Sequence, residues 1–139
     1  MARTKTAVVE ALERVPLLSG LSKKDRGRLA SSMKEATYPA GKEIVVEGRA
    51  GIGFFVITGG SAAVSIGGEV VRMLGPGDYF GEMALIDGGK RSATVRADSD
   101  LEVLTMSSWT FKSFVQDHPA VAWALLGTMA ERMRESTVR

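Results

Sequence analysis

The segment with the clearest chemical potential runs from Phe80 to Ser92 and reads Phe-Gly-Glu-Met-Ala-Leu-Ile-Asp-Gly-Gly-Lys-Arg-Ser. Its first half, Phe80–Ile86, is predicted to form a short helical turn after a strand, and the start of a helix offers unpaired backbone N–H groups to an anion. Gly81 lets the backbone approach a ligand closely. Arg91 is suited to a bidentate contact with a phosphate, and Glu82 to accepting hydrogen bonds from a diol such as ribose. On spacing alone, this anion site competes with the simpler interpretation that Arg91 is solvated.

The rest of the chain must supply the domain that positions these residues. The chain has 139 residues, of which 45% are hydrophobic and 24% charged, enough for one sizeable core and too few for two. A formal net charge of +2 argues against a protein built mainly to neutralise nucleic-acid phosphates. Cysteine is absent and His118 is the single histidine, which excludes disulfides and the histidine cluster that a metal enzyme of the cupin type requires.

No segment of the sequence predicts attachment to a membrane. The opening Met-Ala-Arg-Thr-Lys is basic, but the apolar region of a signal peptide does not follow it. No apolar run approaches the ~20 residues of a membrane-spanning helix. We therefore expect a protein of the cytoplasm with no membrane partner.

Glycine spacing indicates a central β region. Between Gly41 and Gly89, glycines separate short apolar runs at intervals of about eight to twelve residues, which is typical of a β-sandwich or barrel. Thr58–Ser61 and Ile66–Glu69 each contain Gly-Gly and are predicted to be hairpin turns. The predicted strands are Glu43–Val46, Phe54–Thr58, Ser61–Ile66, Glu69–Leu74, Tyr79–Phe80, Ala93–Ala97 and Leu101–Met106.

Helical periodicity precedes and follows this region. An apolar stripe over residues 6–14 stops at Pro16, and Ser22 with Asp25 three residues later resembles a capping box. Ser107 or Ser108 is predicted to cap a further helix, and Pro119 suits the first position of the last one. In that last helix one stripe is predicted to pack, namely Ala122, Leu125, Leu126, Met129 and Met133. Trp109 and Trp123 are also predicted to pack.

Residues 80–97, Phe-Gly-Glu-Met-Ala-Leu-Ile-Asp-Gly-Gly-Lys-Arg-Ser-Ala-Thr-Val-Arg-Ala, closely resemble the phosphate-binding cassette of cyclic nucleotide-binding domains. That family includes the bacterial catabolite activator, the regulatory subunit of protein kinase A and cyclic nucleotide-gated channels. The resemblance continues through Val15–Leu21, Tyr38–Ile44, Phe54–Ser61 and Leu74–Glu82. It implies a mainly β fold with flanking helices, in which a β-roll, or jelly-roll-like barrel, follows an N-terminal helical bundle and precedes C-terminal helices.

The same resemblance sets the expected organisation and the expected site. One domain, 1–139, is divided into N-terminal helices (1–35), the β-roll with its cassette (36–106) and C-terminal helices (107–139). Arg91 is expected to bind the cyclic phosphate and Glu82 the ribose 2′-hydroxyl. The other expected site residues are Phe80, Gly81, Met83, Ala84, Ser92, Ala93 and Thr94, together with Arg132 on a lid helix. For Arg132 a solvated side chain is an equal alternative.

The function that the resemblance implies is ligand sensing without catalysis and without a metal. Ser92 stands where the family has Thr in many cyclic GMP binders and Ala in cyclic AMP binders, and we favour cyclic AMP (cAMP) over cyclic GMP (cGMP). Lys90 departs from the proline that many members have before the arginine. We expect a regulatory module that signals by movement of its C-terminal helix to an unknown protein partner or fused effector, with no direct DNA binding. The alternative is a degenerate, ligand-free interaction module of the same fold.

Overall fold

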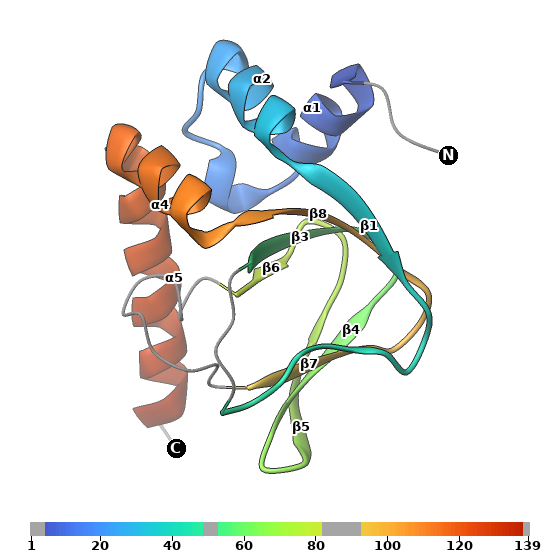
Figure 1. Cartoon of the computed structure of the whole chain (residues 1–139). Helices are drawn as coiled ribbons and strands as arrows, with labels where there is room; N and C mark the ends of the chain where they lie inside the picture. The colour runs from blue at the N-terminus through green and yellow to red at the C-terminus, as the bar shows by residue number, and fades with distance from the viewer. Residues whose placement is uncertain (1–4, 49–52, 82–92, 138–139) are drawn as a thin grey trace.

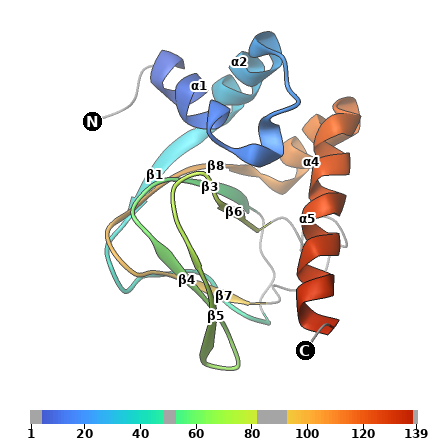
Figure 2. The same cartoon turned by 180° about the vertical axis from the view of Figure 1, so that it is seen from behind.

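The computed structural model describes residues 5–48, 53–81 and 93–137 (Figure 1). Two four-stranded antiparallel sheets, of order β1-β8-β3-β6 and β2-β7-β4-β5, face each other and are not closed into a barrel. Helices from both ends of the chain lie against the first sheet (Figure 2). The elements are α1 (Lys5–Glu13), η1 (Pro16–Leu18), α2 (Lys23–Ser32), β1 (Lys34–Tyr38), β2 (Glu43–Val45), β3 (Gly53–Gly59), β4 (Ala62–Ile66), β5 (Glu69–Leu74), β6 (Tyr79–Phe80), β7 (Thr94–Ala97), β8 (Leu101–Ser107), α4 (Ser108–Asp117) and α5 (Pro119–Thr137).

Alternation along the strands of the first sheet divides the interior into two clusters, because successive side chains of a strand point to opposite faces. Phe54 and Val56 of β3 face the helices, while Ile57 faces the second sheet. We call the first group the helical cluster; its buried members are Val8, Leu12, Val15, Leu17, Leu18, Leu21, Leu29, Ala30, Phe54, Val56, Tyr79, Leu104, Met106, Phe111, Val121 and Leu125. We call the second the roll cluster; its buried members are Ile57, Ala62, Leu74, Phe80, Val95, Ala97, Leu101 and Val103.

The predicted helix starts are confirmed by their caps. The Ser22 hydroxyl accepts a hydrogen bond from the backbone N–H of Asp25 at 3.1 Å, at the start of α2. Ser107, rather than Ser108, is the N-cap residue of α4, and its hydroxyl accepts from the N–H of Thr110. Pro119 is the first residue of α5, a position where its missing N–H has no helical partner to lose.

One of the two predicted hairpins is correct and the other is wrong. Ile66–Glu69 joins β4 to β5, which pair antiparallel. Thr58–Ser61 joins β3 of the first sheet to β4 of the second, so these two strands do not pair. Here Gly60 adopts φ +81°, and a Cβ added to it would overlap the backbone carbonyl oxygen of Asp100. The chain therefore crosses between sheets, where the local Gly-Gly signal predicts a reversal within one sheet.

One strand was missed, and two expectations about packing require correction. Strand β1 was not predicted, because its Lys-Glu-Ala-Thr-Tyr sequence is largely polar and exposed. Its pairing partner is β8, far along the chain.

In α5, Leu125 is buried as expected, but Leu126 and Met133 are 57% and 69% exposed. Trp109 and Trp123 are 67% and 77% exposed and do not pack in the interior. Among the described residues, no helix combines the length and apolar character that crossing a membrane requires.

Candidate functional site

The structure describes both ends of the predicted cassette. Its first residues, Phe80 and Gly81, lie at and just after the end of β6, which pairs with β3 in the first sheet. Its later residues, Ala93 and Thr94, lie at the start of β7, which pairs with β2 and β4 in the second sheet. Between these two points the chain passes from one sheet to the other, so the cassette is held by both. Five predicted site residues lie outside the described part of the chain: Glu82, Met83, Ala84, Arg91 and Ser92.

Strand β6 has only two residues, and each is anchored on a different face. Tyr79 belongs to the helical cluster and lies 5.8 Å from the ring of Phe54, measured between ring centroids. Phe80 is buried in the roll cluster and stacks on Phe55, with centroids 4.8 Å apart and planes inclined by 10°. Aromatic burial of this kind stabilises each side by about 1.5–3 kcal/mol. The position of the next residue, Gly81, is therefore set from both sides of the sheet.

Gly81 follows this anchor directly and has an uncommon backbone conformation. Its φ of +97° lies in the left-handed region, which a residue with a Cβ rarely adopts. The sequence argument for Gly81 was close approach of the backbone to a ligand; the structure adds that the backbone conformation itself favours glycine at this position.

The other end of the cassette is held by a residue that the sequence analysis missed. The backbone N–H of Glu47 donates to Oγ1 of Thr94 at 3.0 Å, and Oε1 of Glu47 accepts from the N–H of Gly67 at 2.9 Å. Glu47 thus ties the start of β7 to the turn between β4 and β5. No spacing in the sequence relates these three residues, because each lies in a different strand or turn. The only signal available was an acidic residue, Glu47, directly after the predicted strand Glu43–Val46.

Three predicted site residues remain, namely Ala93, Thr94 and Arg132. Ala93 and Thr94 are half-buried, and the Thr94 hydroxyl is already engaged with Glu47. Arg132 lies within α5, and its side chain is not among those that the structure describes. No cluster of three or more histidine, cysteine, aspartate or glutamate residues suited to a metal occurs in the described ranges.

The sequence profile of the cyclic nucleotide-binding domain matches residues 35–118. The chain belongs to the cyclic nucleotide-binding domain family. The match begins within β1 and ends at the α4–α5 junction, so it covers both sheets and the whole cassette.

Curated relatives of this cyclic nucleotide-binding domain are regulatory proteins. The chain is 42% identical over 102 residues to a cAMP-dependent protein kinase regulatory subunit of Eremothecium gossypii, covering 73% of this chain and 22% of that protein. It is 32% identical over 126 residues to the Cyclic AMP receptor protein of Thermus thermophilus, covering 87% of this chain and 58% of that protein. The chain therefore spans less than two thirds of the length of these relatives.

Solved structures agree with the fold. The cAMP-bound PfPKA-R (141-441) has a TM-score of 0.85 at 27% identity, over 94% of this chain and 45% of that one. The Thermus thermophilus Catabolite Activator Protein has a TM-score of 0.78 at 32% identity, over 87% and 59%. A regulatory subunit of a cAMP-independent protein kinase A from Trypanosoma brucei also shares the fold, with a TM-score of 0.81 at 23% identity, over 89% and 45%. The fold of this cyclic nucleotide-binding domain therefore does not by itself specify the ligand.

Proposed function

We propose that the chain is a sensor module that binds cAMP in preference to cGMP and passes the signal on through movement of α5. The observation that supports it best is the continuous cassette sequence from Phe80 to Ala97. Its first end is held by the first sheet and its second end by the second sheet. Arg91 pairs with the cyclic phosphate and Glu82 accepts from the ribose 2′-hydroxyl. The named ligand of several relatives is cAMP, which supports the same choice.

The distribution of burial along α5 supports a moving C-terminal helix. Val121 and Leu125, in its first two turns, are 1% and 3% exposed and join the helical cluster. From Leu126 onward the described side chains are exposed or half-buried. A helix fixed only at its beginning can change position at small cost in buried area, and a ligand shifts it by its differential contacts with the two positions. We propose that the signal is received by a protein partner or a fused effector in the cytoplasm, and that this chain does not itself contact DNA.

Calorimetric titration with cAMP and cGMP tests the ligand assignment. Arg91→Ala leaves the ligand phosphate without its partner and is expected to weaken cAMP binding by about 2–5 kcal/mol, or roughly 30-fold to several thousandfold. Arg96→Ala is the matched control, because Arg96 is exposed on β7 only five residues away and its removal is expected to leave binding within threefold. Wild-type protein that binds neither nucleotide favours the ligand-free interaction module instead.

Hydrogen exchange tests the movement of α5. Saturating cAMP is expected to change amide protection over residues 126–134 more than over 119–125, because the first two turns are already buried. Equal protection with and without bound nucleotide, in a protein shown by calorimetry to bind it, contradicts the α5 proposal while leaving the binding assignment intact.

A further inference from the structure

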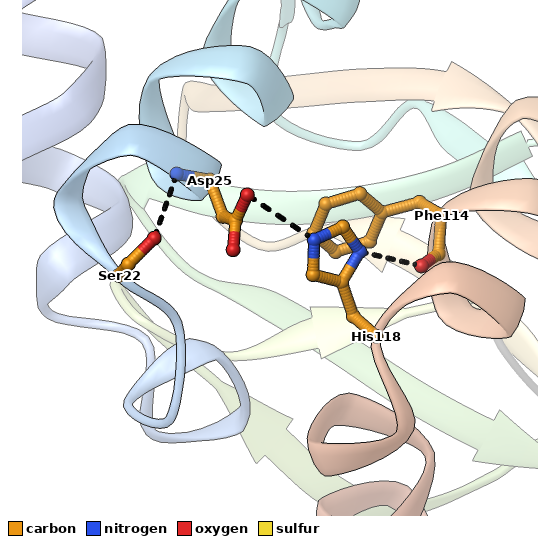
Figure 3. A network of polar contacts seen from close by, with 4 residues as sticks. All are labelled: Ser22, Asp25, Phe114 and His118. Atoms are coloured by element: carbon orange, nitrogen blue, oxygen red, sulfur yellow. Dashed lines mark hydrogen bonds and ion pairs between the residues drawn. The ribbon is translucent and has the colours of Figure 1, made fainter.

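The single histidine of the chain occupies the junction between α4 and α5 (Figure 3). Its backbone N–H donates to the carbonyl oxygen of Val115 at 3.1 Å, and its carbonyl oxygen accepts from the N–H of Val121 at 2.9 Å. Its ring stacks on Phe114 with centroids 4.2 Å apart. His118 is therefore fixed by the helix before it and by the helix after it, and its ring has little freedom to turn away.

Both ring nitrogens of His118 face groups that only accept hydrogen bonds. Nδ1 lies 2.8 Å from the carbonyl oxygen of Phe114, and Nε2 lies 3.4 Å from Oδ1 of Asp25 in α2. A neutral imidazole carries one N–H and can satisfy one of these acceptors, whereas the imidazolium ion carries two and satisfies both. The arrangement therefore selects the protonated ring, and the side chains of His118 and Asp25 are only 19% and 28% exposed.

Asp25 is itself held in position by the first turn of α2. Its backbone N–H donates to the Ser22 hydroxyl, and its carboxylate faces the His118 ring (Figure 3). The preceding loop lies close to α5, since a Cβ added to Gly20 would lie 3.5 Å from the Cβ of Ala120. The short helix η1 and the start of α5 also share the helical cluster, through Leu18 and Val121.

The surroundings of the pair favour the charged form of both side chains. The pKa of His118 is raised from 6.5, first by the hydrogen bond to the Phe114 carbonyl, against the opposing effect of burial, and then by Asp25 and the neighbouring Asp117. The pKa of Asp25 is lowered from 3.8, chiefly by its hydrogen bond with His118, against the opposing effect of burial, and the Ser22 side chain and then Arg28 in α2 add to the lowering. Among the described residues packed against the pair, η1 and the first turn of α5 contribute no charged side chain.

We propose that His118 and Asp25 form a proton-operated latch that joins the first turn of α2 to the α4–α5 junction and closes when His118 is protonated. The latch requires no bound nucleotide, so it stands apart from the ligand assignment. Because the buried side chains among the described residues of α5, Val121 and Leu125, lie near its start, the latch acts on the part of α5 that anchors the helix. Closing it favours the arrangement of helices that the structure shows.

The pH range in which the latch is closed follows from the directions of the two pKa shifts. Since the folded pKa of His118 lies above 6.5, its stabilisation is complete below pH 6.5 and is lost as the pH rises through that folded pKa. Since the folded pKa of Asp25 lies below 3.8, its stabilisation is complete above pH 3.8 and is lost as the pH falls through that folded pKa. The latch is therefore closed between pH 3.8 and 6.5 and opens on the alkaline side.

Titration of the histidine by NMR tests the latch directly, because His118 is the only histidine to assign. Asp25→Asn removes the charge and keeps the backbone N–H that caps α2, so the helix is retained. The pKa of His118 is expected to fall in Asp25→Asn, and to fall further than in the control Asp117→Asn, which removes a nearby charge without the direct contact. Equal pKa values in these two variants, or a wild-type value in Asp25→Asn, overturn the proposal.

A double-mutant cycle separates a latch from ordinary packing. The free energy of unfolding is measured for wild type, Asp25→Asn, His118→Gln and the double variant at pH 5.5 and again above the measured pKa of His118. We expect a favourable coupling at pH 5.5 that is reduced by at least half at the higher pH. Helix-dipole effects of Asp25 do not interfere, because Asp25 is ionised at both pH values. Coupling that is equal at both pH values, or absent at both, contradicts the latch.

Discussion

The helical cluster and the roll cluster share strands β3, β6 and β8 but are assembled differently. Every buried member of the roll cluster lies in a strand, so sheet register places it. The helical cluster draws on the two N-terminal helices, η1, the same sheet, α4 and α5, and its helices are placed by side-chain packing and the His118 contact. The comparison supports our proposal that the sheets hold the cassette in place while the helical layer beside them moves in response to a ligand.

The turns at one end of the roll show how the frame is fixed. The N–H of Asp98 donates to the carbonyl oxygen of Ser61 at 2.9 Å, and the N–H of Ala40 to Oδ1 of Asp100 at 3.2 Å. Gly41 and Ala97 are joined by a further backbone bond of 2.8 Å. Three turns from separate parts of the chain thus hold one another, and the sheets they connect cannot slide independently.

Adjacent phenylalanines on β3 offer the strongest way to break the comparison. Phe54→Ala empties the centre of the helical cluster, where Phe54 is 1% exposed and stacks on Phe111 at 4.0 Å, and is expected to cost about 3–5 kcal/mol of unfolding free energy. Phe55→Ala, on the opposite face and half-buried, is expected to cost about 1–2 kcal/mol. Urea denaturation measures both, and Phe54→Leu replaces Phe54→Ala if the latter does not fold. A larger loss in Phe55→Ala would mean that the roll, not the helical layer, depends more on aromatic packing.

Two glycines with nearly equal backbone angles test the rigidity of the frame. Gly60 and Gly68 have φ of +81° and +83°, so both alanine variants bear a conformational cost of about 1 kcal/mol. Only at Gly60 does the added Cβ meet the Asp100 backbone; nothing lies within 4 Å at Gly68. Thermal unfolding is expected to show Gly60→Ala destabilised by about 2–4 kcal/mol. Equal losses at the two sites would show that the crossing turn yields easily.

The smallest expected effect concerns the serine cap that stabilises the start of α2 in the helical layer. Ser22→Ala removes the hydroxyl that caps α2 and is expected to cost about 1 kcal/mol. Ser31→Ala is the control in the same helix, because the Ser31 hydroxyl only donates to the carbonyl oxygen of Gly27 one turn back; its effect is expected within about 0.5 kcal/mol of zero. Chemical denaturation distinguishes the two. Indistinguishable variants would mean that packing alone sets the stability of α2.

The sequence predicted correctly those elements that are determined by residues close to one another in the chain. Glu69–Leu74 is β5 with the predicted bounds, and the caps at Ser22 and Ser107 are hydrogen bonds over three residues. Two identical Gly-Gly signals had different outcomes, because the backbone of Asp100 beside Gly60 belongs to a distant turn. Strand β1 was missed for the same reason, since its pairing with β8 is invisible in its own sequence.

For the site, the cassette was found through its resemblance to a family, while the spacing of its residues left a solvated Arg91 open. Phe80 and Thr94 were predicted as site residues, and the structure shows what holds them: Phe55 for the first and Glu47 for the second. Neither partner is near the cassette in sequence. Trp109 and Trp123 were predicted to pack but are exposed. Apolar periodicity does not show which face of a helix meets the protein.

The placement of β8 in the middle of its sheet also sets the order in which the chain can be completed during synthesis. Both β1 and β3 pair with β8, with Lys34 opposite Thr105 and Phe55 opposite the same threonine. Among the described strands, only β4 and β5 pair with a direct neighbour in sequence and can do so as they leave the ribosome. Until Leu101–Ser107 has left the ribosome, β1 and β3 both lack their pairing with β8, and an unpaired strand edge can pair with another chain and aggregate. Once β8 has left the ribosome, both strands can pair with it, and α4 and α5 dock afterwards.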